Sequence, residues 1–321
     1  MKYVLSLVVG LVIGAVAGGG ASAQTVNYPT KPIRLLIPFV SGGGADAVAA
    51  AISDELSKRL GQPIVKSNHP GSNSVIGTAL LAKSAPDGHT LLLVTPGFVN
   101  NPYLYANLPY KTPDAFAPVS ILTSYPFVLG VRRDLPFNSV EEMITFAKAN
   151  PGKLRAATPG RGAAAHLTLG LLNNLSGSEI RSIPFKGAGE GLNAVAGGFV
   201  DMVFSGFETV RPFVEGGRMR YFGSSGAALE SVGIPSISDT VPGFEYLNWM
   251  ALIAPAGTPT AVLDKLNAAL ASVFADPKVK ERLAALNIDI IVSSHEEAKE
   301  YVVQQMAVGK KIVESLGLKP E

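Results

Sequence analysis

The pattern of apolar and polar positions is clearest between residues 33 and 60. Residues 33–39 (IRLLIPF) form an almost wholly apolar run, typical of a parallel strand buried on both faces. A glycine-rich turn follows, and Asp46 then begins a predicted helix that ends at Leu60. This arrangement leaves backbone N–H groups unpartnered at the positive end of a helix, where an anion is favoured. The alternative is a plain connecting turn in which Asp46 only caps the helix.

The same strand–loop–helix pattern recurs along the chain and predicts an α/β fold with a parallel sheet. Two longer apolar runs, 119–132 and 246–255, are suited to cross between domains. We therefore expect two lobes, one formed by 24–125 with 247–321 and the other by 126–246. Open α/β sheets bind ligands beyond the strand ends, so the cleft between the lobes is the expected site. Further strands are predicted at 64–68, 91–94, 154–158, 180–185, 200–204 and 288–292.

Composition narrows the class of protein. The chain has 321 residues, of which 47% are hydrophobic, so it can bury more than one core. Its 27 basic and 25 acidic residues form no basic cluster, which argues against nucleic acid as a partner. Four scattered histidines and no cysteine give no metal-ligand spacing, and we expect no cofactor.

The first 23 residues have the features of an export signal. Lys2 precedes an apolar run over 4–16, and residues 21–23 (ASA) form a cleavage site. The apolar run is too short, and too interrupted by Gly10 and Gly14, for a membrane span. We expect cleavage after Ala23 and a free protein in the periplasm.

A second glycine-containing loop allows more than one interpretation. Gly160, Gly162 and Ala165 match a loose dinucleotide fingerprint, which would make the protein an exported dehydrogenase with Glu179 on the ribose. The alternative is a second helix N-terminus facing the cleft, with Arg161 as a bidentate carboxylate clamp. A third possibility is that Arg161 is simply solvated at the surface.

Other catalytic patterns are weaker. Residues 223–226 (GSSG) lack the spacing of a hydrolase nucleophile turn, and His166 is better suited to cap or pack at its helix start than to act as a base. We therefore predict no catalytic residue. The aromatic residues Phe98, Phe207 and Trp249 lie near predicted strand ends, and Trp249, on the returning cross-strand, is expected at or near the cleft.

Many short motifs follow one another over nearly the whole mature chain: 28–34 (YPTKPIR), 38–46 (PFVSGGGAD), 60–63 (LGQP), 86–91 (PDGHTL), 116–119 (FAPV), 151–154 (PGKL), 166–167 (HL), 184–187 (PFKG) and 254–259 (APAGTP). Together these motifs resemble those of the Bug receptors, the periplasmic solute-binding proteins of tripartite tricarboxylate transporters. The resemblance implies a two-lobed type II periplasmic-binding-protein fold that closes on a small organic carboxylate and delivers it to a pair of membrane permease subunits. It implies neither a cofactor nor a catalytic residue.

The departures from the family pattern concern the ligand. Val40 and Ser41 stand where Pro-Pro is common, Val75 replaces a common asparagine and Ser205 a common acidic residue. The second loop carries Arg161 in place of hydroxyl donors. These changes predict a less polar and locally more cationic cleft, suited to an aromatic carboxylate or a dicarboxylate. Arg161 would hold one carboxylate, and the first loop would hold the other or bridge to it through water.

We expect a monomer whose ligand-binding residues come from both lobes. A signalling receptor with the same ligand grip, or an exported enzyme, is the alternative function. The predicted ligand-binding residues are Val40, Ser41, Gly42, Gly43, Gly44, Ala45, Asp46, Ser72, Thr95, Pro96, Phe98, Thr158, Arg161, Gly162, Ala163, Ala164, Ala165, His166, Lys186, Gly187, Ser205 and Trp249.

Overall fold

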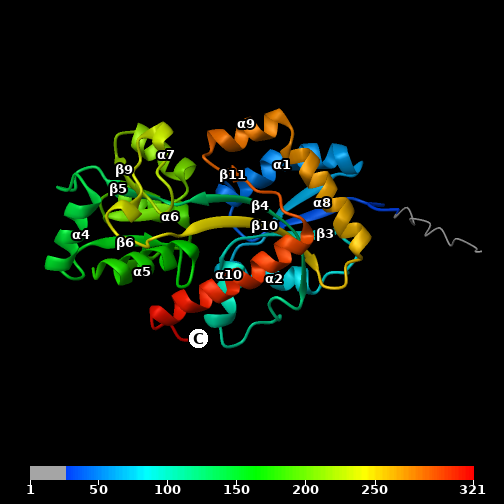
Figure 1. Cartoon of the computed structure of the whole chain (residues 1–321), viewed down its shortest axis with the longest axis horizontal. Helices are drawn as coiled ribbons and strands as arrows, with labels where there is room; N and C mark the ends of the chain where they lie inside the picture. Colours follow the sequence, from blue (N-terminus) through cyan, green and yellow to red (C-terminus); the bar gives the residue numbers. More distant parts are fainter. Residues whose placement is uncertain (1–26) are drawn as a thin grey trace, which may run out of the picture.

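The structure, a computed structural model, describes residues 27–321, so the predicted export signal over 1–23 lies outside the described part. Two α/β lobes lie side by side, each built on its own sheet (Figure 1). This confirms the predicted two-lobed α/β class. No helix within 27–321 combines the length and the apolar character that a membrane crossing requires.

The sheet of the first lobe has six strands in the order β11-β4-β10-β3-β1-β2. β1 is parallel to β2 and β3, as predicted, whereas β10 is antiparallel to β3 and β4. The sheet is therefore mixed and not wholly parallel, because one strand leaves the lobe and its neighbour returns. The strands are β1 (Ile33–Ile37), β2 (Ile64–Asn68), β3 (Thr90–Val94), β4 (Phe116–Pro126), β10 (Leu247–Pro255) and β11 (Asp289–Ile290).

The sheet of the second lobe has five strands in the order β7-β6-β8-β5-β9. β6 is parallel to β7 and β8, and β5 is antiparallel to β8 and β9. β9 and the helix before it, α7, were not predicted; α7 carries Pro212 inside it, which sequence patterns take as a break. The strands are β5 (Val128–Arg132), β6 (Arg155–Thr158), β7 (Arg181–Pro184), β8 (Met202–Ser205) and β9 (Met219–Ser224).

Two chain segments connect the lobes, and one serine bonds to both. β4 passes into β5 through Phe127, and the return path enters β10 after Tyr246. The Ser225 N–H donates to Phe127 O at 2.8 Å, and the Ser225 hydroxyl donates to Tyr246 O at 2.6 Å. Ser225 is completely buried, so these bonds fix the two crossing segments side by side.

Helices cover both sheets, and the last one reaches from one lobe to the other. α10 begins at the predicted capping box of Ser294 and Glu297 and runs beneath the gap toward α5 of the second lobe (Figure 1). The α-helices are α1 (Gly44–Leu60), α2 (Val75–Ala82), α3 (Gly97–Asn100), α4 (Val140–Ala149), α5 (Ala164–Ser176), α6 (Ala188–Ala196), α7 (Phe207–Glu215), α8 (Thr260–Phe274), α9 (Pro277–Ala285) and α10 (His295–Ser315).

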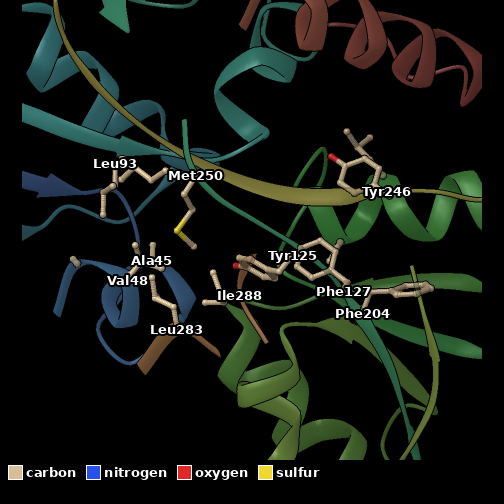
Figure 2. Packing of buried hydrophobic residues seen from close by; sticks show 14 of the residues in the cluster. Ala45, Val48, Leu93, Tyr125, Phe127, Phe204, Tyr246, Met250, Leu283 and Ile288 are labelled. Atoms are coloured by element: carbon tan, nitrogen blue, oxygen red, sulfur yellow. The ribbon is translucent and has the colours of Figure 1, made fainter. Parts of the chain in front are cut away.

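The largest hydrophobic core continues from one lobe into the other. Met250 in the first lobe and Phe204 in the second belong to the same buried cluster, which Tyr125 and Phe127 connect at the crossing (Figure 2). The crossing is therefore a packed part of the core and not a loose linker.

Candidate ligand-binding site

A cavity of about 290 Å³ lies between the lobes, at the point where four helices, α1, α5, α6 and α7, begin. Both lobes contribute to its wall. The predicted residues that line it are Val40, Gly43, Gly44, Ala45, Ser72, Thr95, Thr158, Ala163, Ala164, Ala165, Lys186, Gly187 and Ser205.

The start of α1 presents unpaired backbone donors to this cavity. The helix begins at Gly44, two residues before the predicted start, and its N-cap, Gly43, offers no side chain. The first helical bond is donated by the Ala47 N–H to Gly43 O at 3.0 Å, so the N–H groups of residues 44–46 precede it. The Asp46 carboxylate accepts the Gly42 N–H at 3.1 Å, outside the cavity wall. Asp46 therefore orders the loop instead of lining the site.

The start of α5 repeats this arrangement from the second lobe. Its N-cap, Ala163, has no capping side chain, and the first helical bond is donated by the Leu167 N–H to Ala163 O at 3.0 Å. His166 Nδ1 accepts the Gly162 N–H at 2.9 Å. Burial, and then the charge of Arg161, lowers the pKa of His166, which keeps the ring neutral and able to accept this bond. Gly162 and His166 thus shape the loop without lining the cavity.

Arg161 does not occupy the predicted clamp position. Its Nη1 lies 2.5 Å from Glu321 Oε1, and its Nη2 donates to Lys319 O at 2.9 Å. The segment after α10 is held against the first lobe by bonds between Glu321 and the backbone of Leu104 and Ala106. The guanidinium is therefore engaged outside the cavity wall, because a segment more than 150 residues away in sequence supplies its partners.

Trp249 also lies elsewhere than predicted. It is 1% exposed and packs edge-on against Tyr301 of α10, with ring centroids 5.6 Å apart. Its neighbours Asn248 and Met250 line the cavity instead. Successive side chains of a strand point to opposite faces, so the prediction selected the correct strand but the wrong face.

Four other predicted residues also lie off the cavity wall. Phe98 is buried against Phe116, with ring centroids 5.2 Å apart, and belongs to the core. Pro96 borders a second cavity, of about 240 Å³, beside α10. Ser41 is exposed at the loop tip, and Gly42 has positive φ there, 87°, which glycine tolerates.

The crossing strands contribute residues that sequence reasoning missed. Asn248 Nδ2 donates to the hydroxyl of Tyr125 at 2.5 Å, and burial raises the pKa of Tyr125 to about 12. Figure 2 shows Tyr125, Met250 and Ile288 gathered beside Ala45 of α1. The two-residue alternation along each crossing strand was the signal that could have identified Asn248 and Met250.

The hydroxyls on the wall of the second lobe are bonded to one another. Thr158 Oγ1 lies 2.8 Å from Ser182 Oγ, and Ser205 Oγ lies 2.8 Å from Thr209 Oγ1. Glu208, which was not predicted, also lines the cavity; burial raises its pKa, and one oxygen lies 3.1 Å from Arg211.

A left-handed loop of the first lobe completes the wall. Ser72, Asn73 and Ser74 have φ values of 46°, 48° and 71°, a conformation that costs an L-residue roughly 1–2 kcal/mol. The amide of Asn73 donates to Asn101 Oδ1 at 2.9 Å and to Gly162 O, across the cleft, at 3.2 Å. The loop is therefore held from both lobes.

Two α/β lobes connected by packed crossing strands, with helix N-termini facing one interlobe cavity, define a solute-binding receptor of the periplasmic-binding-protein class. Residues 48–318 match the family described as "Tripartite tricarboxylate transporter family receptor". The chain belongs to this family of periplasmic solute-binding receptors, and the resemblance to the Bug receptors is confirmed.

Two relatives match nearly all of the described chain. A protein from the tcbD-tcbE intergenic region of Pseudomonas sp. (strain P51) is 34% identical over 279 residues, 85% of this chain and 83% of the relative. Protein BugT of Bordetella pertussis is 30% identical over 320 residues, 98% of each chain.

Two solved structures of bacterial proteins have the same fold. Rpa4515 of R. palustris, solved with adipate, superposes with a TM-score of 0.86 at 28% identity, over 92% of this chain and all of that one. MatC of Rhodopseudomonas palustris, solved with bound malate, gives a TM-score of 0.81 at 28% identity, over 89% of this chain and all of that one.

Proposed function

We propose that this protein captures a small organic carboxylate in the interlobe cavity, for delivery to the membrane permease subunits of a tripartite tricarboxylate transporter. The observation that carries the proposal is the convergence of α1 and α5, one from each lobe, on one cavity with uncapped first turns. Several N–H donors at two positive helix ends favour an anion. The carboxylates bound by Rpa4515 and MatC support the same ligand class.

Capture in this proposal depends on both lobes. Backbone donors at residues 44 and 45 and at residues 164 and 165 share the carboxylate, which therefore bridges the lobes and favours their closed arrangement. The two lobes are 24–125 with 247–321, and 126–246. The crossing at Phe127 and Tyr246, tied by Ser225, is the hinge about which they close.

The remaining parts of the proposal follow from the family role. The chain is exported, cleaved after Ala23 and acts in the periplasm as a monomer. It binds and releases its ligand without chemical change, so it is a receptor and not an enzyme. The permease subunits are its protein partners, and family membership supports this assignment.

A thermal-shift and calorimetric panel on residues 24–321 tests the ligand class. Adipate, hexanoate, benzoate and malate are compared with the corresponding amides, which have similar shape but no charge. We expect at least one acid to raise the melting temperature by mass action and to bind at least tenfold tighter than its amide. Equal binding of acid and amide, or binding of neutral or cationic compounds alone, would contradict the proposal.

A further inference from the structure

On the basis of the carboxylate-receptor function proposed above, we infer that the cavity selects carboxylates whose remaining part is hydrocarbon, either aryl or alkyl. Short hydroxylated acids are disfavoured in the same cavity. The inference depends on the composition of the walls around the two helix N-termini and on which polar groups there are already bonded.

An apolar wall borders the anion-binding end of α1. Tyr125 comes from β4, Met250 from β10, and Leu286 and Ile288 from the segment between α9 and β11. Three distant parts of the first lobe thus contribute side chains to one apolar surface, and Figure 2 shows three of these side chains beside Ala45. Met250, Ile288 and Tyr125 are each no more than 7% exposed, so the wall is packed and preformed.

The apolar wall begins within contact distance of the backbone donors. A Cβ atom placed on Gly44 would lie 3.6 Å from Cε of Met250, and 2.9 Å from the hydroxyl oxygen of Tyr125, which is the polar end of this wall and accepts a bond from Asn248. A carboxylate held by the N–H groups at the start of α1 therefore projects its next atoms along this wall. Each methylene that becomes buried there favours binding by roughly fourfold.

The hydroxyls of the opposite wall are already bonded to one another. Thr158 is paired with Ser182, and Ser205 with Thr209, each at 2.8 Å. Because Thr209 also donates to Gly206 O at 2.7 Å, both O–H groups of its pair are used, and a ligand hydroxyl could only donate to this pair. A buried ligand hydroxyl therefore exchanges its bonds to water for few new ones here, whereas a hydrocarbon body gains from the apolar wall.

The charged side chains on the cavity wall also favour a carboxylate with a hydrocarbon body. Among the described residues that line the cavity, the charged side chains are Lys186, which is exposed, and Glu208, which is acidic. The nearby guanidinium of Arg161 is engaged with Glu321 and with Lys319 O. Lys186 is therefore the one cationic side chain that the described cavity wall offers in addition to the helix N-termini, which favours a ligand of low charge over a polycarboxylate.

Calorimetry on residues 24–321 with hexanoate, benzoate, adipate, malate and citrate tests the inference. We expect the tightest of the three hydrocarbon-rich acids to bind at least tenfold tighter than malate and citrate. Malate or citrate binding as tightly as the best hydrocarbon-rich acid would overturn the inference while leaving the carboxylate-receptor function in place. Failure of every carboxylate to bind would overturn both.

A pair of variants from one short segment locates the effect. Ile288→Ala should weaken binding of the best hydrocarbon-rich acid by about fivefold, because apolar contact is lost, and change malate binding by less than twofold. Ile291→Ala is the matched control, since Ile291 is 46% exposed and lies off the cavity wall. Leu286→Ala replaces Ile288→Ala if the latter does not fold. An equal loss for both classes of acid would overturn the inference.

Discussion

At the scale of single residues, the proposed site offers a ligand backbone groups more than side chains. Gly43 and Ala163 are N-caps without capping side chains, so the first turns of α1 and α5 retain their own N–H donors for a ligand. Backbone donors cannot be removed by ordinary substitution, but proline removes one where the local conformation permits it.

Ala164→Pro makes that test at the first position of α5. Proline is well tolerated there, and Ala163 already has the extended conformation (φ −61°, ψ 153°) that proline requires before it. Loss of one donor to a carboxylate should weaken binding by about 1.5–3 kcal/mol, measured by calorimetry with the best ligand. Ala164→Ser keeps the N–H and is the control. Affinity for Ala164→Pro equal to that of the serine variant would exclude this N–H from the ligand contacts.

His166 predicts a pH dependence of stability at the same loop. Its pKa is lowered in the fold, so on acidification through about pH 6.5, the ordinary value, the unfolded chain takes up the proton first. The stability contributed by neutral His166 is therefore present above that pH and lost as the pH falls through the folded pKa. His166→Asn keeps an acceptor for the Gly162 N–H without titrating. Its melting temperature should fall less than that of the wild type between pH 7.5 and 5.5; equal falls would contradict this role.

At the scale of elements, the sequence predicts most of the fold and the loops that both lobes contribute to the cavity wall, but not the residues of the crossing strands. Apolar runs bounded by glycine and proline identify β1, β3, β6 and β8, and the loops after β1 and β6 line the cavity as predicted. These elements can be predicted from short stretches of sequence, because the spacing of apolar residues differs between a strand and the helix that follows it. Such local patterns do not show which face of a strand buried on both faces points to the cleft. The prediction therefore places Trp249 at the cleft, where the structure has Asn248 and Met250.

The close approach of α1 to β4 provides a test of this packing. Gly44→Ala places a Cβ only 2.9 Å from the Tyr125 hydroxyl oxygen, and Tyr125 is itself held by Asn248. Overpacking of this kind costs about 1–3 kcal/mol, and part of it should appear as weaker ligand binding. Gly43→Ala is the matched control, because its nearest neighbour would be 3.9 Å away. Equal affinities of the two variants in calorimetry would argue against a constraint at Gly44.

At the scale of the whole molecule, the segment after α10 joins the lobes by a contact that no local pattern indicates. Arg161 belongs to the second lobe, while Glu321 is bound to the backbone of the first. The predicted clamp and the observed ion pair use the same guanidinium, and the structure assigns it to the pair. The contact is distant in sequence, so only the assembled fold reveals it.

Removal of this ion pair should therefore lower the free energy of unfolding more clearly than it changes the ligand affinity. The two side chains are 35% and 75% exposed, so a double-mutant cycle of Arg161→Ala and Glu321→Ala should give a coupling of about 0.2–1 kcal/mol in unfolding, weaker at high salt. Ligand affinity of Arg161→Ala should change by no more than about fivefold, because closure can shift by no more than the energy of the pair. A loss of about tenfold or more would return Arg161 to the ligand contacts.

The central claim is that two helix N-termini, one from each lobe, share a carboxylate. A crystal structure of residues 24–321 grown with the tightest acid of the panel tests it most directly. We predict carboxylate oxygens within about 3 Å of backbone nitrogens among residues 44, 45, 164 and 165, with the hydrocarbon part against Met250 and Ile288. A ligand bound in the cavity with its carboxylate remote from both helix starts, or bound outside the cavity, would contradict the account.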